Sequence, residues 1–245
     1  MTSILDQPLG DLVVETPAAA RIFDRVGLDY CCRGRRTLSQ ACATAGVDAA
    51  AIADELHELD ALDRSPQDGW ASLGPVALAE HIVTVHHAYL REELPLLSAL
   101  ACKVDGVHAA RHPELRETRA LVDELRSDLE PHLDKEERVL FPAIRAVVDE
   151  GRQVFPFGPL ANPIRMMTVE HDRVGELLEE LRCATGGYSV PADACASYRS
   201  LYGRLNALEH DTHVHVHKEN HVLFPAALRA WDTIDVETER GGVAR

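Results

Sequence analysis

The sequence is poor in aromatic residues, in positive charge and in long apolar runs, and each shortage excludes something. Aromatic residues make up only 5% of the chain, whereas alanine and leucine are abundant, which favours an all-α fold. The 25 basic residues are outnumbered by 40 acidic ones, and the net charge of −15 argues against nucleic acid and membrane surfaces as partners. No apolar run approaches the roughly 18 residues of a membrane span.

The first residues indicate a cytoplasmic protein, and this bears on how the cysteines are interpreted. Asp6 and Asp11 lie where a secretory signal peptide would be basic and then apolar. In the cytoplasm, the six cysteines are expected to be thiols rather than a disulfide framework. A chain of 245 residues can bury a sizeable core without such cross-links.

Turn-forming residues separate a small first domain from the rest of the chain. Residues 1–63 are predicted to be a helical domain, with a first helix that starts at Thr16-Pro17 and ends at Gly27. Two more short helices are expected over 37–45 and 48–62. Residues 64–75, rich in proline and glycine, have the composition of a linker.

The remainder is predicted to be an antiparallel four-helix bundle over residues 76–231. Its helical periodicity covers four segments, at 76–104, 113–150, 161–184 and 191–230. Residues 232–245 are expected to form a flexible tail. The predicted fold is therefore all-α, with a small N-terminal helical domain followed by the bundle.

The bundle contains an internal repeat that carries histidine and glutamate. His132-x-x-x-Glu136 is followed by Leu-Phe-Pro, and His215-x-x-x-Glu219 is followed by the same three residues, 83 positions later. Stepping back 84 positions from His171 reaches His87. Each half of the bundle thus supplies one separate histidine and one His-x-x-x-Glu pair.

Helical spacing places these repeated residues on inward faces. Steps of three and four residues join Leu208 and Thr212 to His215 and Glu219, which therefore continue an apolar stripe. On the other three helices, the same steps give apolar stripes through the remaining members of the repeat, which are His87, His132, Glu136 and His171. His86 also fits an inward face, and only the repeat offset favours His87 over it.

A rival set of histidines shares the last helix of the bundle. These residues extend a polar face, so they are interpreted as solvated, with a second metal site on the surface as the alternative; they are His210, His213, His217 and His221.

Two glutamates inside a bundle need compensating positive charge, because each would otherwise cost several kcal/mol. No lysine or arginine shares the stripes at the same level, whereas four imidazoles beside two carboxylates suit a pair of iron or manganese ions. Imidazole and carboxylate favour iron over thiolate-preferring metals. Two six-coordinate ions need about 12 bonds; bridging by both glutamates and by one oxo or hydroxo group leaves about one open position on each ion. The sequence predicts a di-iron site made of His87, His132, Glu136, His171, His215 and Glu219.

Two adjacent cysteines, Cys31 and Cys32, lie in the predicted first domain. Three nearby arginines, at positions 33, 35 and 36, should lower the thiol pKa. Neighbouring cysteines rarely bridge each other. The pair could be redox-active, form an intermolecular disulfide or hold metal or cluster in transit, or it could simply belong to a packed turn. The other cysteines are interpreted as core or surface residues; they are Cys42, Cys102, Cys183 and Cys195.

Over about residues 6–230, the chain resembles the iron–sulfur cluster repair di-iron proteins, also called RIC proteins. The resemblance rests on Asp6-Gln7-Pro8-Leu9-Gly10, Asp29-Tyr30-Cys31-Cys32, Arg91-Glu92-Glu93-Leu94-Pro95 and both Leu-Phe-Pro repeats. It implies a hemerythrin-like bundle whose iron ligands are the six residues above. Two positions depart from the family pattern, Arg33 in place of glycine and Leu90 in place of histidine.

Glu170 matches a glutamate of the family pattern. Adjacent residues of a helix diverge by about 100°, so Glu170 should not share the face of His171. A solvated side chain is expected, and a gate or a proton relay is the alternative.

The resemblance implies a role in repairing clusters damaged by oxidative or nitrosative stress, through iron donation or handling of nitric oxide. Damaged iron–sulfur proteins would be the partners, nitric oxide or dioxygen the small ligands, and a homodimer is one possible assembly. Two other functions fit the same site: reduction of nitric oxide or a peroxide, and carriage or sensing of dioxygen or nitric oxide.

Overall fold

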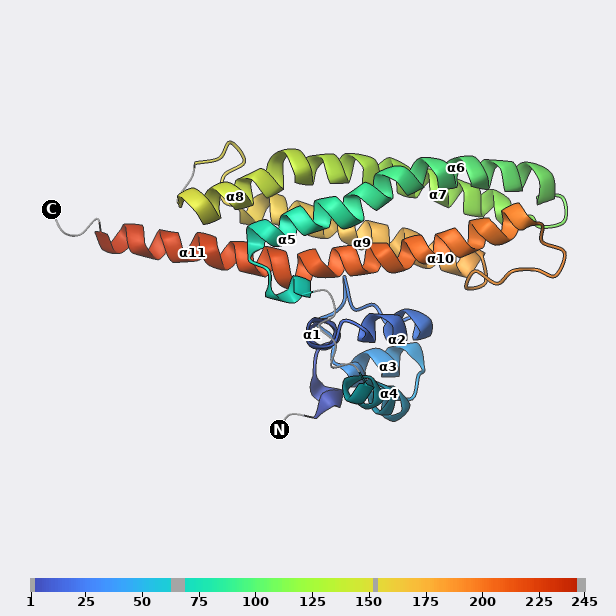
Figure 1. Cartoon of the computed structure of the whole chain (residues 1–245), viewed down its shortest axis with the longest axis horizontal. Helices are drawn as coiled ribbons and strands as arrows, with labels where there is room; N and C mark the ends of the chain where they lie inside the picture. The colour runs from blue at the N-terminus through green and yellow to red at the C-terminus, as the bar shows by residue number, and fades with distance from the viewer. Residues whose placement is uncertain (1–2, 63–68, 152–153, 242–245) are drawn as a thin grey trace.

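The computed structural model describes residues 3–62, 69–151 and 154–241, and these form a small helical domain beside a long helical bundle (Figure 1). In these residues the regular elements are all helical, and one isolated β-bridge joins Pro8 to Thr37. The all-α prediction is confirmed. None of the described helices combines the length and the apolar character that a membrane crossing needs.

The small domain packs five short helices around an apolar core that includes Phe23 and Tyr30. Thr37 and Gln40 form a capping box at the start of α3, and Gly27 ends α2 in the left-handed conformation at φ 70°. The elements are η1 (Ile4–Asp6), α1 (Leu9–Glu15), α2 (Ala19–Val26), α3 (Leu38–Ala45) and α4 (Ala49–Leu62). The helix α1, which is only two turns long, was not predicted from the sequence, and α2 begins later than predicted because Thr16-Pro17 belongs to the turn between them.

The bundle consists of four helical segments that run side by side (Figure 1). The first contains α5 (Pro75–Ile82), η3 (Val83–His87) and α6 (Ala88–His108). The second contains α7 (Glu114–Lys135), η4 (Glu136–Leu140) and α8 (Phe141–Glu150), and the third is α9 (Ala161–Ala184). The fourth contains α10 (Ala196–His217), η5 (Lys218–Leu223) and α11 (Phe224–Gly241).

Two separate apolar clusters fill the bundle, one toward each end. The first joins α6, α7, α9 and α10 and includes Leu133 and Leu208. The second joins α5, α8, α9 and α11 and includes Leu140 and Leu223. Glu136 lies between Leu133 and Leu140 in the sequence, and Glu219 lies between Leu208 and Leu223. The candidate site therefore lies between the two apolar clusters.

The structure places two boundaries differently from the prediction. Trp70, in η2 (Gly69–Ser72), is buried in the second apolar cluster, so part of the predicted linker is packed; residues 63–68 of that linker lie outside the described residues. The helix α11 continues to Gly241 rather than ending at 231, because 232–240 contains neither proline nor glycine. The last residues of the predicted tail, 242–245, lie outside the described residues.

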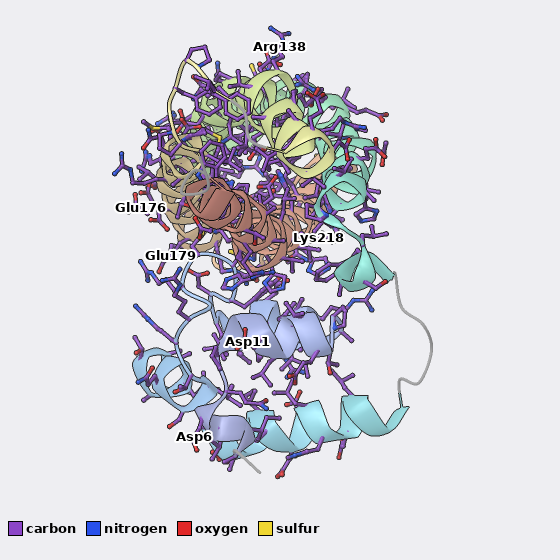
Figure 2. The ribbon with its side chains drawn as sticks, turned by 90° about the vertical axis from the view of Figure 1, so that its left-hand side faces the viewer. Asp6, Asp11, Arg138, Glu176, Glu179 and Lys218 are labelled. Atoms are coloured by element: carbon purple, nitrogen blue, oxygen red, sulfur yellow. The ribbon has the colours of Figure 1, made fainter. Side chains whose placement is uncertain are left out.

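The small domain docks on one flank of the bundle, beside α10 and η5. Viewed from the end, Glu176, Glu179 and Lys218 lie on this flank and Arg138 on the opposite one (Figure 2). At the contact, the ring of His221 lies against Gly10 and Gly34, and its Nε2 donates to the Cys31 carbonyl at 3.0 Å. Larger residues at these glycines would prevent this approach.

Replacing Gly34 with alanine should therefore destabilise the chain. The added Cβ would collide with the Tyr30 carbonyl oxygen and lie 2.6 Å from His221 Nε2. We expect the free energy of unfolding to fall by about 1–3 kcal/mol in urea titrations. Gly203→Ala is the matched control, since nothing lies within 4 Å of its Cβ position on α10, and it should stabilise by about 0.5–1 kcal/mol. Equal effects of the two substitutions would contradict the tight contact.

Candidate metal centre

Six buried side chains converge between the two apolar clusters, and all four helical segments contribute. Each is at most 1% exposed. They are His87, His132, Glu136, His171, His215 and Glu219. The six residues that the sequence analysis selected are thus brought together by the fold.

The six side chains form two groups that share both glutamates. In one group, His87 and His215 face each other with their Nε2 atoms 3.2 Å apart; in the other, His132 and His171 do the same at 3.2 Å. Within each group, all ligand atoms lie within 4.8 Å of one another. Each group is therefore compact enough to surround one metal ion.

The shared carboxylates lie between the two histidine pairs. Glu136 Oε2 is 3.4 Å from Nε2 of both His87 and His132. Glu219 places Oε1 3.2 Å from His215 Nε2 and Oε2 3.1 Å from His171 Nε2. Each carboxylate thus contacts one histidine from each pair.

The hydrogen bonding of this cluster favours a pair of cations. All four oxygens of Glu136 and Glu219 are buried and lack a hydrogen-bond partner among the described residues. Buried carboxylates normally have partners, and imidazole nitrogens that face each other need a proton or a cation between them. The residues therefore fit two metal ions with nitrogen and oxygen ligands.

Both glutamates are held in the charged form. Burial and the neighbouring Glu219 act to raise the pKa of Glu136, but His132 and His87 outweigh them, so the pKa is lowered. Burial acts to raise the pKa of Glu219, but His215 and His171 outweigh it, so the pKa lies well below its ordinary value. The centre thus needs positive charge, which either protons on imidazoles or metal ions can supply.

Three of the four histidines have an outer hydrogen-bond partner at Nδ1. His87 bonds Glu137 at 3.0 Å, His132 bonds Glu170 at 2.9 Å, and His171 bonds Asn220 at 3.0 Å. Such bonds fix the tautomer and orient Nε2 toward the centre. No described residue bonds Nδ1 of His215.

Glu170 is not the solvated side chain that the sequence analysis expected. Besides its bond to His132, it accepts a hydrogen bond from Lys135 Nζ at 2.6 Å, and 25% of its side chain is exposed. Although it lies beside His171 in sequence, it supports His132 across the gap between α9 and α7. Helical angle alone could not show this, because the contact joins two helices.

Of the adjacent pair His86 and His87, the structure places in the cluster His87, the histidine that the repeat offset favours. His86 is buried outside the six-residue cluster, where its Nδ1 bonds Asp211 at 2.9 Å and its ring stacks on His215. Lys218 Nζ donates to His86 Nε2 at 2.8 Å. Of these two neighbours, His87 is the one that directs Nε2 at the glutamates.

Three turns of π-helix, η3, η4 and η5, lie at the level of the centre. His87 is the last residue of η3, Glu136 the first of η4, and Glu219 belongs to η5. A π turn widens the helix and is frequent at functional sites. These turns were not predicted, because apolar stripes with steps of three and four residues presuppose a regular α-helix.

The prediction that the four rival histidines are solvated is wrong for His217, whereas His210 keeps 41% of its side chain exposed. His217 is fully buried, and its ring contacts Tyr30, Trp70 and His221. His210 and His213 both bond the carboxylate of Asp24 on α2. The face on which they lie is polar, but the small domain covers part of it, which a bundle considered by itself could not predict.

The cysteine pair lies where the small domain meets the centre. Cys31 and Cys32 are free thiols with their Sγ atoms 3.7 Å apart, and Cys32 Sγ donates to the His171 carbonyl oxygen at 3.4 Å. Asp29 Oδ1 accepts from the backbone N–H groups of both cysteines. A cavity of about 540 Å³ adjoins the pair and is also lined by acidic residues, among them Glu176 and Glu179.

The expectation of a low thiol pKa is wrong for Cys31. The hydrogen bond with Cys32, and then burial, raise the pKa of Cys31 well above its ordinary value. Arg33 lies 3.9 Å from Asp29, and this acid offsets its charge. Of the remaining cysteines, Cys42 is buried, and the other three are exposed.

Comparison with known proteins assigns the chain to a family. The model for the hemerythrin HHE cation binding domain matches residues 78–227, and a domain of unknown function, DUF542, matches residues 5–60. Proteins named iron–sulfur cluster repair protein YtfE are similar over both parts. The one from Enterobacter sp. (strain 638) is 37% identical over 223 residues, covering 91% of this chain and 97% of the relative.

Other relatives agree with this assignment. The protein of the same name from Escherichia coli O157:H7 is 36% identical over the same shares of both chains, and that from Citrobacter koseri is 35% identical over 92% of this chain and 98% of the relative. The chain therefore belongs to the hemerythrin HHE cation binding family and, within it, to the iron–sulfur cluster repair proteins, as the resemblance in its sequence predicted.

Proposed function

We propose that this protein repairs damaged iron–sulfur clusters and that two iron ions occupy the six-residue centre. The observation that carries the proposal is the pair of histidine groups that share both buried glutamates. This centre lies in a chain that is similar over both domains to proteins named for cluster repair. Imidazole and carboxylate ligands without thiolate favour iron over thiolate-preferring metals, and the position of Glu136 and Glu219 supports a bridging role.

On this proposal, the iron bound at the centre is also the iron that is donated to a damaged cluster. A pair of ferrous ions supplies iron for rebuilding a cluster and electrons for reducing small oxidants. Cys32 contacts the backbone of His171, and the adjoining cavity has an acidic lining that attracts cations. We propose that iron passes from the His132–His171 side of the centre to Cys31 and Cys32, and from there to a damaged iron–sulfur protein in the cytoplasm.

Reactivation of a damaged dehydratase tests this function. The iron-loaded chain is mixed anaerobically with a dehydratase whose [4Fe–4S] cluster has lost one iron by oxidation and kept its four sulfides, so that one ferrous ion and one electron restore it. Enzyme activity and the iron content of both proteins are followed. We expect activity to return as iron moves to the dehydratase. Unchanged iron in the chain would contradict donation and favour a carrier, whereas repeated consumption of nitric oxide with an electron donor would favour a reductase.

Replacing Cys32 with serine should slow this reactivation several-fold while leaving the iron content unchanged. The thiol lies outside the six-residue cluster, so its loss removes a transfer group and no iron ligand. Cys102→Ser is the matched control, because Cys102 is exposed on α6, away from the small domain. A wild-type rate in the Cys32 variant would contradict the proposed transfer route.

A further inference from the structure

Asn220 connects the small domain to the candidate metal centre. It follows Glu219 in η5, and its side chain makes one hydrogen bond in each direction. Oδ1 accepts from His171 Nδ1 at 3.0 Å, and Nδ2 donates to the Cys31 carbonyl oxygen at 3.2 Å. One amide thus contacts both the cysteine loop and a proposed metal ligand.

The Cys31 carbonyl determines which way this amide faces. A carbonyl oxygen only accepts, so it requires the NH₂ group of Asn220, and the amide oxygen must then face His171. An oxygen in that position requires a proton on Nδ1, which leaves Nε2 of His171 free to bind a metal. With the cysteine loop displaced, the amide can turn over and donate to Nδ1, which favours the tautomer with a protonated Nε2.

Of the two proposed metal positions, the one at His132 and His171 has a side-chain amide as an outer hydrogen-bond partner. The partners of His87 and His132 are the carboxylates of Glu137 and Glu170, which accept hydrogen bonds in any orientation. The cysteine loop makes a second contact with the same ligand residue, from Cys32 Sγ to the His171 carbonyl at 3.4 Å. His221 Nε2 donates to the Cys31 carbonyl as well and holds it in place.

We propose that Asn220 is a positioning residue through which docking of the Cys31–Cys32 loop controls metal affinity at the His132–His171 position. A docked loop holds the metal there, and a displaced loop weakens its binding, while the metal at His87 and His215 is retained. The inference rests on the proposed metal role of the centre and names which of its two positions releases metal.

Metal affinity, measured without any repair reaction, tests this coupling. Ferrous iron is removed anaerobically from the full-length chain with increasing amounts of a chromogenic chelator, which resolves strong from weak positions. Asn220→Leu should weaken one of the two positions by about 10–100-fold and leave the other unchanged, since loss of an outer hydrogen-bond partner has effects of this size. Asn206→Leu, at an exposed asparagine of α10, is the matched control.

The conservative variant separates positioning from packing. Asn220→Asp keeps an acceptor for His171 Nδ1, so it should restore the affinity that Asn220→Leu loses. Gly34→Ala, which shifts the cysteine loop, should weaken the same position in the wild-type background but not beside Asn220→Asp.

The alternative outcomes overturn the inference. Retention of both metals by Asn220→Leu, loss of both, or no rescue by Asn220→Asp would show that Asn220 does not position His171. A wild-type chain that binds no ferrous iron would count against the proposed metal centre itself. Failure of dehydratase reactivation with intact metal binding would instead count only against the repair function.

Discussion

Replacing Glu219 with leucine should abolish the binding of both iron ions. Its carboxylate contacts His215 in one group and His171 in the other, so a single substitution removes a ligand from each position. The loss should exceed the roughly 10–100-fold that an outer hydrogen-bond partner contributes. Iron per chain, measured after anaerobic reconstitution and desalting, should fall from two to near zero.

The metal-free chain shows whether this substitution removes a ligand or disrupts the fold. Without metal, loss of Glu219 removes its ion pairs with His215 and His171 but also relieves its repulsion of Glu136, and the imidazoles can lose their protons. The metal-free variant should therefore unfold cooperatively, with a free energy of unfolding within about 3 kcal/mol of the metal-free wild type. Urea titration of the metal-free proteins measures this difference.

Glu209→Leu is the matched control for Glu219→Leu. Glu209 is another buried glutamate of the same helical segment, but it accepts two hydrogen bonds from Arg182, each at 2.9 Å. Its loss should lower stability, because Arg182 loses its partner, and should leave both irons bound. Equal iron loss in the two glutamate variants would contradict the assignment of Glu219 to the centre.

The six inward side chains could be selected from sequence because their positions are encoded locally. A residue spacing of four on a helix fixes a common face, and the duplicated His-x-x-x-Glu shows that both halves place the same groups at the same depth. The offset of the repeat even separated His87 from His86, which periodicity could not. The overall bundle followed from the same periodicity and from the turn residues between its segments.

Features that depend on contact between helices or domains were not predictable in this way. The outer partner of His132 comes from α9, and the histidines that bond Asp24 are covered by a domain distant in sequence. One signal was nevertheless present. Glu137 and Asn220 each follow the glutamate of a repeat, so the repeat marks equivalent outer positions as well as the inner ones.

Removing the metal from the wild-type chain should lower its thermal stability strongly. The carboxylates of Glu136 and Glu219 are fully buried and share no hydrogen bonds with described residues, so cations are their natural compensation. A ligand at 100 times its dissociation constant stabilises a folded chain by about 2.7 kcal/mol, and two such sites give about 5 kcal/mol. In a chain of this size, that corresponds to a fall in Tm of roughly 10–20 °C, measurable by anaerobic calorimetry with and without chelator.

The Glu219→Leu variant shows whether this stabilisation comes from the proposed centre. Because the variant should bind neither iron, its Tm should not change when chelator is added. The wild-type chain should lose stability when chelator is added, since both buried carboxylates then have only the imidazoles to compensate their charge. A chelator response of equal size in both proteins would mean that the stabilising metal binds elsewhere on the chain.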